Sequence, residues 1–171
     1  MTNTKKITIT AIFIAIGIVL PIAFHALPDG GQAFLPMHIP VLMCGLIVSP
    51  LYGFLAGVLT PLLSSLLTGM PPVLFLPAML FELAAYGLVA SLCMKYLNIK
   101  NATVKLYVSL IIAMIVGRVV SGLVNALFFA VGHYSMQIWL TASFVTALPG
   151  IIIILILVPL IILALKRFKA I

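Results

Sequence analysis

Residues 95–105 read KYLNIKNATVK, a basic stretch that stands between two long apolar parts of the chain. This stretch and the two chain ends hold eight of the nine basic residues, which are Lys5, Lys6, Lys95, Lys100, Lys105, Lys166, Arg167 and Lys169. Lysine and arginine gather in the cytoplasmic connections of membrane proteins. An even number of membrane spans before and after residues 95–105 would therefore place all three basic clusters in the cytoplasm.

The composition excludes a water-soluble protein. Of the 171 residues, 65% are hydrophobic and 6% are charged, whereas a soluble domain carries about 25% charged residues. The excess of nine basic over two acidic residues does not indicate a nucleic-acid partner, because the basic residues form short runs between apolar stretches. We therefore expect an integral membrane protein that is surrounded mainly by the lipid bilayer.

Six apolar stretches divide the chain, and they cover residues 7–27, 34–49, 52–68, 74–96, 104–131 and 137–166. A membrane span needs about 20 residues, so the second and third stretches are short enough to be read as one helix. Ser49-Pro50 would then lie in the middle of that helix, and the residue before a proline disfavours the α conformation. Two separate helices also keep the basic clusters on one side of the membrane.

We therefore predict an all-α membrane protein, a single domain of residues 1–171 that forms a compact bundle of six transmembrane helices. Both termini are expected to be cytoplasmic. Pro149 and Pro159 fall within the last stretch, and we expect them to kink one long helix rather than divide it.

Glu82 and Arg118 are ionisable residues that lie well inside apolar stretches, where a charge costs about 3 kcal/mol even on the milder insertion scales. At about 1.5 Å per residue, Glu82 lies roughly 12 Å and Arg118 roughly 20 Å below the outer ends of their helices. An arginine side chain reaches several Å further, so the two groups can meet in the outer half of the bilayer. Two interpretations stay open: a pair that only locks the bundle, and a pocket that also holds a polar solute.

Further polar residues extend this patch at helical spacing. Ser121 and Asn125 follow Arg118 on one face of its helix, and Tyr86 lies one turn after Glu82. Other candidates lie near the outer ends of the predicted helices. The full set of expected substrate-binding residues is Glu82, Tyr86, Arg118, Asn125, His38 and Gln137.

Small residues mark two helix faces. Gly53 and Gly57 form a GxxxG pattern, for which we expect close packing inside the bundle. Ala11 and Ala15 form a similar pattern near the cytoplasmic end of the first helix, where it serves either internal packing or a partner helix. The sequence contains no Walker A, HExxH or GxSxG motif, and its histidines form no convincing metal set or triad. We therefore expect no enzyme activity, no catalytic residue, no cofactor and no metal site.

Six helices in 171 residues resemble the S components, the substrate-capture subunits of energy-coupling factor (ECF) vitamin transporters. The run from Ala11 to Ala15, AIFIA, looks like the A-x-x-x-A motif in the first helix of that family. Residues 48–53, VSPLYG, resemble the glycine–proline turn between its second and third helices, although Ser49 stands where glycine is common.

The resemblance implies a high-affinity capture subunit of an ATP-driven importer in a bacterial cell membrane. Such a subunit binds a B-vitamin-like micronutrient from outside and delivers it through a transmembrane coupling subunit that works with two ATPase subunits. By this resemblance, Ala11 and Ala15 would contact the coupling subunit. No substrate-specific motif of the family matches the polar residues individually.

The substrate and two other classes of protein stay open at this point. Arg118 would suit a carboxylate, as in pantothenate, while Glu82 would suit ring nitrogens or hydroxyls, as in a pyridoxine-like or pyrimidine-type compound. An uncharged polar solute is favoured if the two residues neutralise each other. The alternative classes are a structural membrane scaffold, in which the Glu82–Arg118 pair only packs helices, and a small intramembrane enzyme.

Overall fold

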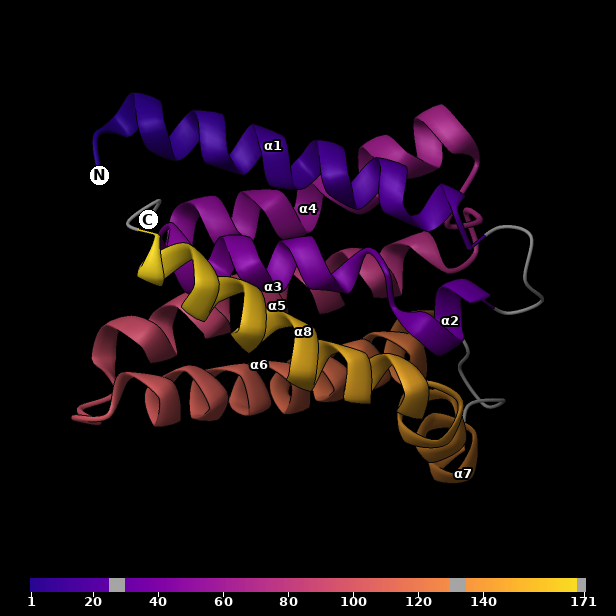
Figure 1. Cartoon of the computed structure of the whole chain (residues 1–171). Helices are drawn as coiled ribbons and strands as arrows, with labels where there is room; N and C mark the ends of the chain where they lie inside the picture. The colour runs from indigo at the N-terminus through magenta and orange to yellow at the C-terminus, as the bar shows by residue number, and fades with distance from the viewer. Residues whose placement is uncertain (25–29, 130–134, 169–171) are drawn as a thin grey trace.

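The computed structural model describes residues 1–24, 30–129 and 135–168, and these form a helical bundle (Figure 1). Six segments are long and apolar enough to cross a membrane. They are α1 (Asn3–Ile22), α2 with α3 (Gly30–Phe34 and His38–Ile47), α4 (Pro50–Thr68), α5 (Leu76–Tyr96), α6 (Ala102–Val124) with the π-helical turn η1 (Asn125–Phe129) as far as Leu127, and α8 (Leu148–Arg167). The predicted all-α bundle of six spans is thereby confirmed.

Local sequence sets where the central helices begin and end. The Asn101 side chain accepts hydrogen bonds from the backbone N–H groups of Thr103 and Val104, at 2.9 and 3.2 Å, and so caps the start of α6. Pro50 occupies the first turn of α4, where a missing N–H costs nothing. Gly69 ends the same helix with φ 73°, a left-handed conformation that glycine adopts without strain.

The second and last spans differ from the predicted boundaries. The predicted helix over 34–49 is interrupted at Leu35, which has φ 53°, because Pro36 disfavours the α conformation in the residue before it. The expected single kinked helix over 137–166 is also corrected by the structure. It divides into α7 (Met136–Leu140), the π-helical turn η2 (Thr141–Thr146) and α8, with Pro149 in the first turn of α8.

The division before α8 has a physical cause. Pro149 has no N–H to donate to the preceding turn, so a helix starts more readily there than it continues through. Pro159 lies inside α8 without dividing it, as predicted. Of the other predicted boundaries, residues 25–27 and 130–131 lie outside the described residues.

Glycine contacts join α4 and α5 more closely than side chains would allow. A Cβ atom on Gly53 would overlap the carbonyl oxygen of Gly87, and a Cβ atom on Gly87 would overlap that of Gly53. A Cβ atom on Gly57 would overlap the backbone of Leu83, and Gly45 of α3 meets Gly87 in the same way. The expectation that Gly53 and Gly57 pack inside the bundle is confirmed.

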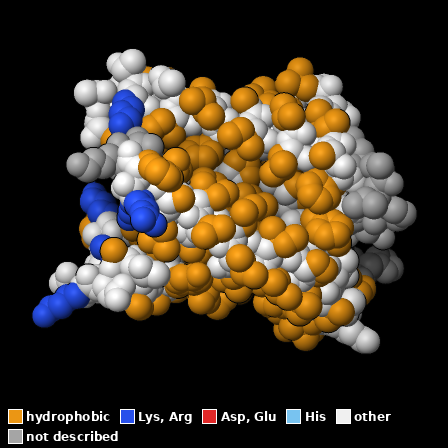
Figure 2. Space-filling view, in the orientation of Figure 1, with side chains coloured by type: hydrophobic (Ala, Val, Ile, Leu, Met, Phe, Trp, Pro, Cys, Tyr) orange, Lys and Arg blue, Asp and Glu red, His pale blue; other side chains and the backbone are white. Residues whose placement is uncertain are grey.

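The basic residues gather at one end of the bundle, which we call the basic end. It comprises the start of α1, the end of α5, the start of α6 and the end of α8, and Figure 1 shows the start of α1 and the end of α8 at the same end of the bundle. Its described basic residues are Lys5, Lys6, Lys95, Lys100, Lys105, Lys166 and Arg167. Figure 2 shows basic side chains at this end and apolar side chains across the middle of the face in view. We call the other end, which carries α2 and α7, the opposite end.

We predict that the basic end faces the cytoplasm, because lysine and arginine are retained on that side. In a variant that lacks Cys44 and Cys93, Gly31→Cys and Gln137→Cys should react with an impermeant maleimide on intact cells. Both positions are exposed at the opposite end. Asn98→Cys, which is exposed at the basic end, should react only after the cells are permeabilised. Labelling of Asn98→Cys on intact cells would contradict the orientation.

Candidate functional site

Glu82 lies at the centre of a buried polar cluster that joins three helices. Its Oε1 atom accepts a hydrogen bond from the hydroxyl of Tyr86, one turn later on α5, at 3.0 Å. The Nη1 atom of Arg118, on α6, lies 2.9 Å from the same oxygen. The Nε2 atom of His38, at the start of α3, lies 3.5 Å from it. Each of the four residues is less than a tenth exposed.

Burial makes these contacts mutually dependent. Removing a carboxylate or a guanidinium group from water costs several kcal/mol, and a partner of opposite charge at hydrogen-bond distance offsets about that much. In a membrane span, an unpaired charge would be similarly costly. Glu82 and Arg118 therefore need each other, and the expectation that the two side chains meet is confirmed.

A second glycine contact allows α6 to approach the Tyr86 ring. Gly117 precedes Arg118, and a Cβ atom at Gly117 would overlap the ring of Tyr86. The ring also packs edge-on against the His38 imidazole, with the centroids 5.4 Å apart. The missing side chain at Gly117 thus brings the Arg118 backbone close enough to α5 for the Glu82 contact.

Several polar atoms of the cluster have no hydrogen-bond partner among the described residues. They are Nε and Nη2 of Arg118 and both ring nitrogens of His38, whose contact with Glu82 lacks hydrogen-bond geometry. Most buried polar groups in native proteins are paired, so such a group needs an explanation. Together with the Glu82 carboxylate, these atoms can donate to and accept from a polar molecule.

A cavity of about 120 Å³ lies beside Arg118, between α6, η2 and α8. Apart from Arg118, its lining is apolar and consists of Ile111, Met114, Ile115, Phe144, Ile151 and Leu155. The cavity gives the Arg118 side chain an apolar neighbourhood that no residue of α5 lines.

Trp139 ties α7 to the same part of α6, and the sequence analysis did not single it out. Its Nε1 atom donates to the carbonyl oxygen of Arg118 at 3.1 Å. A Cβ atom on Gly122 would lie 2.7 Å from its Cδ1 atom, so this glycine makes room for the indole. The one signal available in the sequence was that Trp139 is the single tryptophan of the chain.

The remaining predicted polar residues lie outside this cluster. The Nδ2 atom of Asn125 donates to the carbonyl oxygen of Ser121, on its own helix, at 3.1 Å. Gln137 is exposed on α7. The structure thus brings together four of the six expected substrate-binding residues and leaves Asn125 and Gln137 apart from them.

Ala11 and Ala15 are exposed on α1. The buried residues of this helix, which face the bundle, are Thr10, Phe13, Gly17 and Pro21. The alanine pair is therefore not used for packing among the described residues. It presents a smooth strip of helix at the outer surface of the bundle, towards the basic end.

Comparison with known protein families adds one finding. The family model described as "ECF transporter, substrate-specific component" matches residues 5–162. The match includes the four residues of the polar cluster as well as Ala11 and Ala15. Comparisons with curated proteins and with solved structures gave no match.

We predict that Glu82→Ala lowers the free energy of unfolding by about 3 kcal/mol or more, because Arg118 would keep a buried charge without a partner. The double variant Glu82→Leu with Arg118→Met should recover most of this loss, since apolar residues of similar volume replace both charges. Unfolding of the purified, ligand-free protein in detergent measures both effects. A double variant no more stable than Glu82→Ala would show that the loss does not come from the unpaired charge.

Proposed function

The chain belongs to the substrate-specific components of ECF transporters, and from this premise we propose that its buried polar cluster captures a small, polar, B-vitamin-like compound. The protein is a multi-pass membrane protein and a transport subunit, not an enzyme. The proposed binding residues are His38, Glu82, Tyr86 and Arg118. Asn125 and Gln137 are proposed only as residues along the route to the cluster.

The observation that carries this proposal is the set of unpartnered donors around one carboxylate. A pair that only packed helices would gain from having every donor satisfied within the protein. Instead, Nε and Nη2 of Arg118 have no partner among the described residues, although the side chain is buried. A bound molecule with carbonyl, hydroxyl or ring-nitrogen acceptors would supply those partners.

The charge of the cluster favours an uncharged ligand over an acidic one. Glu82 and Arg118 already neutralise each other at 2.9 Å. A carboxylate ligand would have to compete with Glu82 for the guanidinium group and would add a second negative charge in a buried place. We therefore favour a pyridoxine-like or pyrimidine-type compound, whose ring would also pack against Tyr86, over pantothenate.

Binding requires some movement at the opposite end. Pockets for small molecules measure about 300–1,000 Å³, whereas the cavity beside Arg118 measures about 120 Å³. The segment of α7 and η2 covers this side of α6 and is held there by the Trp139 hydrogen bond. We expect this segment to shift when the ligand reaches Arg118.

Family membership implies partnership with a transmembrane coupling subunit and ATPase subunits. We propose that the exposed strip of Ala11 and Ala15 contacts the coupling subunit. Small side chains let two helices approach closely in lipid, where van der Waals packing drives association. The assembly would then work in a bacterial plasma membrane, with two ATPase subunits.

We predict that Arg118→Ala weakens ligand binding by more than tenfold, or about 1.4 kcal/mol, because the ligand loses its donors and Glu82 loses its partner. Native mass spectrometry of the purified protein would first identify a co-purified compound, and titration would then give the affinities. Arg167→Ala, at the basic end, is the matched control and should bind normally. Unchanged affinity in a folded Arg118→Ala protein would contradict the proposed binding site, but it would not contradict the family membership.

A second prediction separates capture from coupling. Ala11→Trp with Ala15→Trp should hold a partner helix away, because close contact in lipid needs small side chains. Ligand affinity should stay within about twofold of the wild type, while co-purification with the coupling subunit and uptake are lost.

The control for this variant is Ile12→Trp with Ile16→Trp. Both isoleucines are exposed on a neighbouring face of α1. This control should retain co-purification and uptake, because its two tryptophans are centred about 100° around the helix axis from the alanine pair. Normal uptake by the alanine variant would contradict the proposed contact.

A further inference from the structure

A second cavity lies at the basic end, far along the bundle from the ligand cluster. Its volume is about 380 Å³, and it opens between the ends of α3, α5 and α8 and the start of α4. Its polar lining comes from Ser49, Ser91, Lys95 and Lys166. We propose that this cavity binds a phosphate group, which Ser91, Lys95 and the start of α4 hold, while Lys166 adds positive charge from the other side of the cavity.

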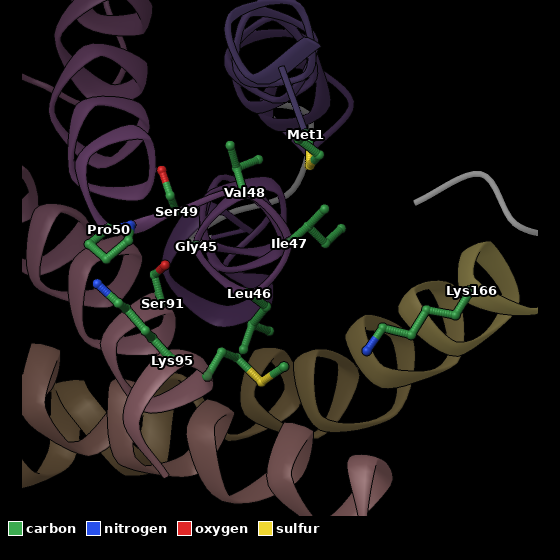
Figure 3. A pocket seen from close by; sticks show the side chains of 11 residues that line it. Met1, Gly45, Leu46, Ile47, Val48, Ser49, Pro50, Ser91, Lys95 and Lys166 are labelled. Carbon is green, nitrogen blue, oxygen red and sulfur yellow. The ribbon is translucent and has the colours of Figure 1, made fainter. Parts of the chain in front are cut away.

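Ser91 is the first observation that points to a ligand. The residue is 5% exposed, and it lines the cavity. Serine hydroxyls inside helices often bond to the carbonyl four residues earlier, as Thr10 does here. Ser91 instead points into the cavity (Figure 3). A hydroxyl in this position can donate to an acceptor that enters the cavity.

Charge is the second observation. Lys95, on α5, and Lys166, on α8, line the cavity from different sides, and the exposed Lys95 side chain extends towards Pro50 at the start of α4 (Figure 3). Glu82 is the one acidic residue in the part of the chain that the structure describes, and it is paired with Arg118. Lys95 makes a cation–π contact, with Nζ 5.0 Å from the centroid of the Tyr96 ring. The two lysines therefore form a positive site that no described carboxylate neutralises.

The start of α4 adds backbone donors to the same cavity. Ser49 and Pro50 line it, and the Ser49 side chain makes no capping hydrogen bond. The N–H groups of Leu51 and Tyr52 consequently have no partner within the helix, and the helix dipole is positive at this end. Phosphate groups bind at such helix starts because they accept several hydrogen bonds and carry negative charge.

The position at the end of the spans suggests two sources of phosphate: the headgroup of an anionic lipid and a free phosphate ion. Basic residues close to a membrane surface attract anionic headgroups. A cavity of about 380 Å³ is large enough for a phosphate with part of a glycerol group attached. The recognising chemistry is the same in both cases, so experiment must separate the sources.

The test uses the full chain, purified in detergent. Native mass spectrometry would measure retention of added phosphatidylglycerol against phosphatidylcholine. Unfolding temperature would be measured in potassium phosphate against potassium chloride of equal ionic strength. We expect the wild type to retain phosphatidylglycerol preferentially. Phosphate stabilises proteins in general because it is excluded from their surfaces, so a rise of the unfolding temperature that Lys95→Ala with Lys166→Ala does not share would show that the site also accepts the free ion. An equal rise in both proteins, or no rise, would assign the site to the lipid.

Variants decide whether the cavity is responsible. Lys95→Ala with Lys166→Ala should lower phosphatidylglycerol affinity by roughly tenfold or more. Lys100→Ala with Lys105→Ala removes the same charge from the same end outside the cavity, and should change affinity less than about twofold. Ser91→Ala keeps every charge and should cost about threefold. This last variant shows whether the hydroxyl binds, even if the lysine pair proves necessary for folding.

Three outcomes would overturn the proposal. One is that the wild type binds neither phosphatidylglycerol nor phosphate. Another is that both lysine pairs weaken binding equally, which would indicate general attraction by the basic end. The third is that two variants, Ser91→Ala and Lys95→Ala with Lys166→Ala, both bind phosphatidylglycerol as tightly as the wild type does.

Discussion

The backbone contact between Gly53 and Gly87 determines where α5 can lie, and most of the bundle depends on α5. This contact and the one between Gly57 and Leu83 press α4 and α5 together without side chains between them. Glu82 precedes Leu83 on the same helix, so the depth at which α4 meets α5 also sets the depth of the carboxylate. Any side chain added at Gly53 or Gly87 would push α5 outward and carry Glu82 away from Arg118.

A similar arrangement is repeated on the other side of α5. Gly117 allows the Tyr86 ring to lie against α6, and Gly122 allows the Trp139 indole to do so one turn further along. The position of the polar cluster therefore depends on these glycines, which let the helices approach closely, as much as on its own hydrogen bonds. Backbones brought this close leave little freedom for the helices to slide, which fits a site that must keep several polar atoms in fixed positions within lipid.

Hydropathy and charge were enough to predict the six spans, because a membrane span depends on the local composition of the chain rather than on contacts with distant residues. The break before α8 was not predicted, since a proline in a hydrophobic run is compatible with either a kink or a new start. Pro149 starts a helix and Pro159 does not divide one. The difference arises from the packing of each segment against its neighbours, which a single sequence does not specify.

The polar cluster could be predicted only in part for a similar reason. The meeting of Glu82 and Arg118 followed from depth and from the cost of a lone charge in lipid. Asn125 shares a face with Arg118 by spacing, but its side-chain amide donates a hydrogen bond to the backbone carbonyl of Ser121, one turn earlier. Trp139 acts through a backbone carbonyl of another segment. Contacts of this kind leave no periodic pattern, so sequence spacing alone does not reveal them.

The pairing of Glu82 with Arg118 has an electrical consequence. A charge that crosses the membrane potential does work of about 2.3 kcal/mol for each 100 mV. The pair has no net charge, so the buried cluster can change its depth or tilt within the membrane field at almost no electrical cost. A bound neutral molecule would leave that balance unchanged, whereas a bound anion would make each such movement depend on voltage.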